Sequence, residues 1–139
     1  MARYLLNEGS FEFGRYTDES MNILARPAPD GSRFGLIVTR IAHQGGLAEF
    51  VEKHLAQHAR ELPAYEFVGQ RETHIDGEPA IEAKFRWFAD PRMVFHHLAY
   101  VLWGPQVLVF TASSLVVFAD ECEAILDEAL TSFSFRRGE

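Results

Sequence analysis

Six prolines divide this chain of 139 residues into short segments, and their spacing limits what it can fold into. They are Pro27, Pro29, Pro63, Pro79, Pro91 and Pro105. Because proline breaks helices and is confined to edges and ends of strands, the segments predict mostly strands, with two long helices among them. None of these segments carries a catalytic constellation, and 47% of the residues are hydrophobic, with 12 phenylalanines. We therefore expect a binding protein rather than an enzyme.

Hydrophobic periodicity places the individual elements between these breaks. Strands are expected at residues 3–6, 10–13, 20–26, 33–42, 65–74, 78–88, 92–103 and 106–114. Apolar residues at helical spacing predict one helix over residues 47–62 and a second from about residue 120. Asp76-Gly77 predicts a hairpin turn between two of the strands.

This order of elements predicts a single domain spanning residues 1–139. Its class is α+β, a curved antiparallel sheet with the two main helices packed on one face. The other face is then solvated, covered by a partner, or itself a binding site. Residues 92–103 are apolar at both alternating sets of positions, and such a strand is expected to be covered on both sides.

Charge and cysteine content limit the possible binding partners and the cellular compartment. The formal net charge is -7 and the pI is about 5.3, which argues against partners with phosphate backbones and against anionic lipid surfaces. Cys122 is the one cysteine, so no intramolecular disulfide forms, as is typical of a reducing compartment. No apolar run has the length of a signal peptide or a membrane span. We expect a cytoplasmic protein that binds no nucleic acid and is not embedded in a membrane.

The histidines and the cysteine are candidates for metal binding or catalysis, but a structural role explains each of them more simply. His54 and His58 lie four residues apart on a predicted helix, but Leu55 stands where the zinc-protease motif requires glutamate. His96 and His97 are adjacent on a predicted strand, so they point to opposite faces. Cys122 lies on an apolar helical stripe and is expected in the core. We therefore expect no catalytic residue, no metal site and no cofactor.

Four segments together indicate a family. They are YLLNE at residues 4–8, SMNI at 20–23, ELPAY at 61–65 and IDGEPA at 75–80. Their order and spacing resemble the DcrB-related proteins and, within them, the Eag chaperones, the effector-associated proteins of bacterial type VI secretion. The chain lacks the lipobox of the DcrB-like lipoproteins, which favours the cytoplasmic Eag branch.

The resemblance implies a PsbP-like fold and a homodimer. It implies that the protein cradles the N-terminal transmembrane helices of a secreted toxin before export and helps to load the toxin onto its spike protein, with no reaction and no cofactor. Carried over segment by segment, the resemblance assigns a client-binding groove to Met21, Ile23, His54, His58, Leu62, Val94, His96 and Leu98. A gap of one residue would replace the last three with Met93, Phe95 and His97.

Two other functions remain compatible with the same sequence. A curved antiparallel sheet with helices can enclose a cavity for a small ligand, as in thioesterase-like and lipid-binding folds. An interaction module of the PsbP-like fold could instead bind a folded, polar partner through its acidic surface. An enclosed cavity lined by His96 or His97 would favour the first alternative, and sensitivity to charge reversal would favour the second.

Overall fold

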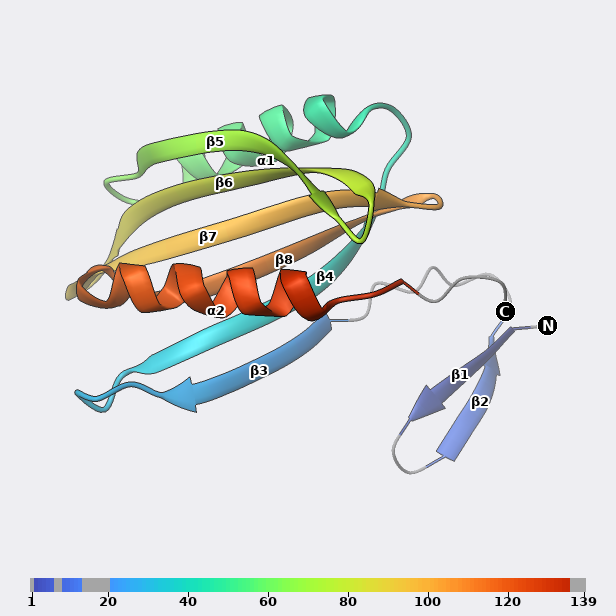
Figure 1. Cartoon of the computed structure of the whole chain (residues 1–139), viewed down its shortest axis with the longest axis horizontal. Coiled ribbons are helices and arrows are strands. Elements are labelled where there is room, and N and C mark those ends of the chain that lie inside the picture. Colours follow the sequence, from blue (N-terminus) through green and yellow to red (C-terminus); the bar gives the residue numbers. More distant parts are fainter. Residues whose placement is uncertain (1, 7–8, 14–20, 136–139) are drawn as a thin grey trace.

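The computed structural model describes residues 2–6, 9–13 and 21–135, with side chains over residues 21–135 (Figure 1). The elements in chain order are β1 (Ala2–Leu6), β2 (Gly9–Phe13), β3 (Met21–Pro27), β4 (Arg33–Ala42), α1 (Leu47–Glu61), β5 (Glu66–Ile75), β6 (Glu78–Ala89), β7 (Arg92–Trp103), β8 (Gln106–Leu115), the 3-10 turn η1 (Val116–Phe118) and α2 (Ala119–Ser132). The expected α+β class with an antiparallel sheet is confirmed.

Six strands form the main sheet in the order β3-β4-β8-β7-β6-β5, and every pairing is antiparallel. Strands β1 and β2 pair with each other as a separate two-stranded sheet. The hairpin expected at Asp76-Gly77 is confirmed. Both residues have positive φ, 48° and 82°, which is the conformation that a two-residue turn between twisted strands requires.

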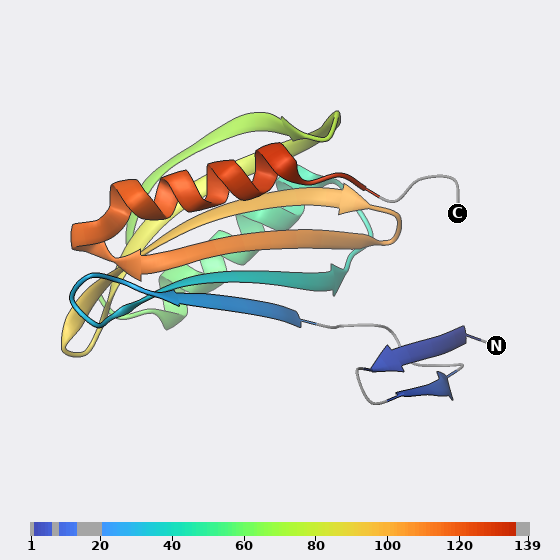
Figure 2. The same ribbon diagram turned by 60° about the horizontal axis from the view of Figure 1, so that its bottom comes forward.

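The two helices lie on opposite faces of the sheet, so the prediction that both pack on one face was wrong. In Figures 1 and 2 the sheet runs between α1 and α2. Each helix has its own core cluster. The α1 cluster contains Phe50, Val51, Leu55, Ile81, Ala83, Phe85, Leu98, Tyr100, Val107 and Val109. The α2 cluster contains Ile75, Ala80, Phe95, Ala99, Val101, Leu108, Phe110, Ala112, Cys122, Leu126 and Phe135.

The central strands explain why the two helices lie on opposite faces of the sheet. In β7, Leu98 and Tyr100 enter the α1 cluster, whereas Ala99 and Val101 enter the α2 cluster. Successive side chains of a strand point to opposite faces, so a strand apolar at every position is stable only with cover on both sides. One helix on each side supplies that cover, and each buried leucine-sized side chain contributes about 1.5–3 kcal/mol.

Cover by the helices is incomplete. Helix α1 packs against β6 and β7, and α2 packs mainly against β7, β8 and β4. The edge strand β3 is therefore exposed along its whole length. Among the described residues, neither helix is both long and apolar enough to span a lipid bilayer.

Candidate functional site

A mainly apolar surface lies on the α1 side of the sheet, beyond the reach of α1. Residues paired directly across antiparallel strands share a face. Ile23 pairs with Ile37, Ile37 with Thr111, and Thr111 with the core residue Leu98. The same register defines what we call the open face, made up of Met21, Ile23, Ala25, Pro27, Arg33, Gly35, Ile37, Thr39, Thr111 and Ser113.

The open face combines exposed apolar side chains with a few hydroxyls. Met21 is 55% exposed and Ile23 is 65% exposed, while Ile37 and Thr111 are half-buried. Gly35 makes room for a neighbouring hydroxyl, because a Cβ at that position would lie 2.9 Å from Ser113 Oγ. The nearby cation Arg40 points to the other side of the sheet, where its Nη1 donates to Asn22 Oδ1 at 2.8 Å. Arg33, exposed at the start of β4, is the charged residue of the open face, and the rest of the face is apolar with neutral hydrogen-bonding groups.

Helix α1 forms a wall beside the open face. A cleft of about 400 Å³ separates the helix from the end of β4. Ile41 lies two residues beyond Thr39 on β4 and lines this cleft, so the cleft continues the open face. The helix contributes Phe50, His54 and Gln57 to the opposite wall, together with the Glu49–Lys53 ion pair.

The helix histidines are held by aromatic partners. His54 Nδ1 lies 2.8 Å from Tyr100 Oη, and its ring stacks on Phe50 with the centroids 5.5 Å apart. The His58 ring contacts His54 edge-on at 4.4 Å and lies 5.2 Å from Phe85. Burial, with a smaller effect of His58, lowers the pKa of His54 to about 4, and burial also lowers the pKa of His58. Both imidazoles are therefore neutral at physiological pH.

His96 continues this row on strand β7. Its ring stacks on Phe85 with centroids 4.9 Å apart, and Trp87 Nε1 donates to its Nε2 at 3.1 Å. Burial, followed by the proximity of His58, lowers the pKa of His96 to about 4. The imidazoles of His54, His58 and His96 are thus neutral groups that can donate and accept hydrogen bonds.

All eight residues assigned to the groove by resemblance lie on the α1 side of the molecule. Met21 and Ile23 are exposed on β3, whereas His54, His58, Leu62, Val94 and His96 are half-buried. Leu98 is only 2% exposed and belongs to the α1 core cluster, so it lies beneath the surface and is not accessible to a partner. The shifted set of Met93, Phe95 and His97 alternates to the α2 side.

Sequence reasoning missed Ile37, Thr39, Thr111 and Ser113. Their membership of the open face depends on the register between β4 and β8, which are separated by a helix and three strands. The alternation of β4 was a usable signal, because it assigns residues 35, 37 and 39 to one side. The pairing partner on β8 was not readable from local sequence.

Cys122 is a buried residue of the α2 cluster, as the apolar stripe predicts. Burial raises the pKa of its thiol to about 11. A thiol with such a pKa is almost entirely protonated at neutral pH, and the thiolate is the reactive form. Its position and its protonation both fit packing rather than nucleophilic chemistry.

Comparison with known proteins gives three similarities. A DcrB family model matches residues 8–132. The chain is 25% identical to a Pseudomonas aeruginosa protein named Effector EagT6 over 118 residues, which cover 82% of each chain. The crystal structure of PA94, a protein of unknown function from Pseudomonas aeruginosa, superposes with a TM-score of 0.84 at 22% identity and covers 99% of each chain. The last similarity shows a shared fold.

Proposed function

The chain belongs to the DcrB family, and we propose that within it the protein is an effector-associated chaperone of type VI secretion. It binds the N-terminal transmembrane helices of a secreted toxin in the cytoplasm, shields them until export, and aids loading onto the spike protein. It catalyses no reaction. The similarity to Effector EagT6 supports the association with an effector.

The observation that carries this proposal is the open face. Charged residues make up 24% of the chain, yet Arg33, at one end, is the one charged residue among the ten residues of the open face. Exposed apolar area is unfavourable by about 25 cal/mol per Å², so a mainly apolar surface favours an apolar partner. A transmembrane helix in the cytoplasm also exposes apolar area to water at the same free-energy cost per Å². Contact with the open face would bury apolar area on both partners.

The dimensions of the sheet fit such a helix. A membrane-spanning helix of about 20 residues is about 30 Å long. Strand β4 has 10 residues, and at about 3.3 Å per residue it runs for about 33 Å. One strand therefore offers support over most of the length of the client helix.

Neutral polar groups on the site suit a client taken from a membrane. Such helices are apolar outside but often carry Ser, Thr or other polar residues that join helices within a bilayer. The hydroxyls of Thr39 and Thr111 and the neutral imidazole of His58 can hydrogen-bond those groups without the cost of desolvating a charge.

A single sheet face covers only one side of a helix. We therefore expect a homodimer, in which a second copy related by two-fold symmetry covers the remaining side of the client. Sedimentation of the client complex should give two copies of the 15.8 kDa chain for each client. A complex with one copy would remove the dimer from the proposal while leaving the binding face intact.

Coexpression tests the function directly. A toxin fragment containing its N-terminal transmembrane helices should be recovered in the soluble fraction with this protein and in the membrane or insoluble fraction without it. The same fragment with those helices deleted is the control, and its solubility should not change. Equal recovery of the helix-containing fragment in both conditions would reject the chaperone function.

A further inference from the structure

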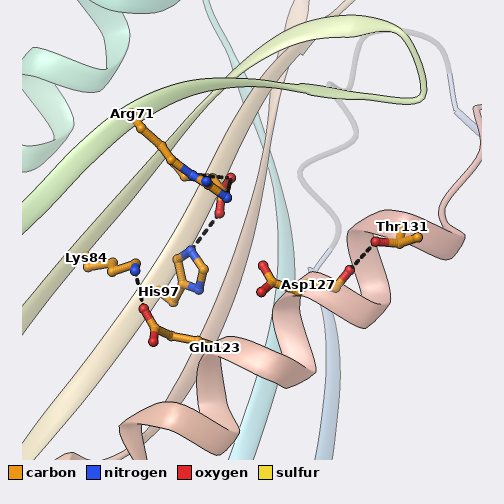
Figure 3. A network of polar contacts seen from close by, with 7 residues as sticks. Arg71, Lys84, His97, Glu123, Asp127 and Thr131 are labelled. Atoms are coloured by element: carbon orange, nitrogen blue, oxygen red, sulfur yellow. Dashed lines mark hydrogen bonds and ion pairs between the residues drawn. The ribbon is translucent and has the colours of Figure 1, made fainter.

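A polar network lies between α2 and the sheet, on the side opposite the open face (Figure 3). Two of its members are buried in an otherwise apolar environment: Glu82 is 3% exposed and His97 is 2% exposed. Burying a carboxylate and an imidazole is costly unless each finds partners. The presence of this costly network therefore requires an explanation. Client binding on the other face of the sheet does not explain it.

Glu82 and His97 hold each other in a fixed orientation. Glu82 Oε1 lies 2.8 Å from His97 Nε2. Glu82 Oε2 accepts from Arg71, at 3.1 Å from Nε and 2.9 Å from Nη2. With a carboxylate at Nε2, the tautomer that fits carries its proton on that nitrogen. Its lone pair is then on Nδ1.

That lone pair is buried and has no partner. Within the described part of the chain, His97 Nδ1 is one of the buried side-chain atoms that make no hydrogen bond. In Figure 3 the Nδ1 edge of the ring is turned toward Asp127 on α2. Buried polar atoms are nearly always satisfied, so an orphaned acceptor indicates a group that belongs at this position.

Asp127 is the nearby acidic group that can share a cation with this lone pair. Glu82 is paired with Arg71, and Glu123 forms an ion pair with Lys84. Asp127 forms no ion pair with any residue that the structure describes, and its side chain is exposed. Glu82, His97 and Asp127 each offer a ligand atom, and these atoms lie within 4.8 Å of one another.

We propose that this cluster binds a divalent transition-metal ion through His97 Nδ1 and the Asp127 carboxylate, with Glu82 orienting the imidazole from behind. A histidine that binds a metal through one nitrogen and donates its other N–H to a carboxylate is a recurrent arrangement. Imidazole together with carboxylate suits zinc and its neighbours rather than calcium or magnesium.

Metal binding requires a ligand separation shorter than the 4.8 Å within which the three ligand atoms lie. Zinc lies about 2.0–2.2 Å from nitrogen and oxygen ligands, so two of them stand at most about 4.4 Å apart. The exposed Asp127 side chain can make up the difference by changing rotamer. Water completes the coordination from the solvent side of Asp127. The ion ties α2 to β7 and is independent of client binding, because the open face is on the other side of the sheet.

Zinc binding to the full chain tests the site. Protein freed of metal with a chelator is titrated with zinc chloride in a calorimeter, and Asp127→Asn is compared with Asp120→Asn on the same helix. The wild type should bind one equivalent and gain thermal stability by mass action. Asp127→Asn should weaken binding by about tenfold or more, whereas Asp120→Asn should stay within about twofold of the wild type.

The imidazole signals identify the ligand. In a nitrogen-detected NMR spectrum, zinc should shift the Nδ1 resonance of His97. No saturable binding would overturn the proposal. Wild-type affinity in Asp127→Asn would overturn it as well, since zinc would then be on other histidines such as His54 and His58. An unshifted His97 signal in zinc-loaded protein would overturn it in the same way.

Discussion

Ile23 and Leu24 are neighbours on β3 with almost equal exposure, 65% and 64%, but their side chains lie on opposite faces of the sheet. Ile23 belongs to the open face. Leu24 lines a cleft of about 310 Å³ between β3, β4 and α2 on the other side. The two residues are therefore a natural matched pair for locating a partner.

An aspartate at each position should separate the two faces. Ile23→Asp places a charge against the client helix and should abolish recovery of the soluble toxin fragment, because an unpaired charge in an apolar contact costs several kcal/mol. Leu24→Asp should leave recovery unchanged. Both variants should fold, since β3 contributes only exposed positions. Equal loss in both, or loss only in Leu24→Asp, would move the binding site to another surface.

Acidification should destabilise the protein through its buried histidines. The pKa of His96 is about 4 in the folded chain and close to 6.5 when unfolded, so below pH 6.5 the unfolded state binds more protons. Stability from this group is complete above pH 6.5 and is lost as the pH falls toward 4. At pH 5 the loss is about 2 kcal/mol relative to pH 7.

Urea denaturation at the two pH values measures this loss. His96→Gln keeps an acceptor for Trp87 Nε1 but does not titrate, so its stability should depend less on pH. His74→Gln, at an exposed position, should retain the wild-type dependence. An undiminished pH dependence in His96→Gln would show that other groups are responsible.

The Tyr100 hydroxyl should stabilise the contact between α1 and the sheet. Burial raises the pKa of Tyr100, so its hydroxyl remains protonated and hydrogen-bonds with His54 Nδ1. Tyr100→Phe removes one hydrogen bond and should lower the free energy of unfolding by about 1 kcal/mol. A double-mutant cycle with His54→Ala should give a coupling energy of about 0.5 kcal/mol or more. Additive effects would mean that the hydrogen bond contributes nothing.

Leu98 should behave as a core residue rather than as a contact residue. Leu98→Ala opens a cavity in the α1 cluster and should cost about 2–5 kcal/mol in urea denaturation. Ile23→Ala, at an exposed position on the same side of the sheet, should cost less than about 0.5 kcal/mol. A small cost at Leu98 would mean that the side chain is more accessible than its 2% exposure indicates.

Local patterns predicted the elements well. The helix expected over residues 47–62 is observed at Leu47–Glu61, because its apolar spacing and the following proline act within a few residues. The Asp76-Gly77 turn was predictable for the same reason. The placement of the helices was not, since helical spacing says that a face is apolar but not which side of the sheet it meets.

Long-range register limited the prediction of both sites. The apolar character of residues 92–103 on both sides correctly indicated double cover, but this signal was outweighed by the assumption of a single covered face. The grouping of Glu82, His97 and Asp127 draws on β6, β7 and α2. No spacing within the sequence marks it, because each member comes from a different element.

The exposure of β3 along its full length has an evolutionary consequence. Its residues lie outside both core clusters, so they can change with little effect on folding. If the open face binds the proposed client, this outer strand can diversify while the scaffold behind it stays constant. Exchanging a few side chains there would then be a practical route to a changed client preference.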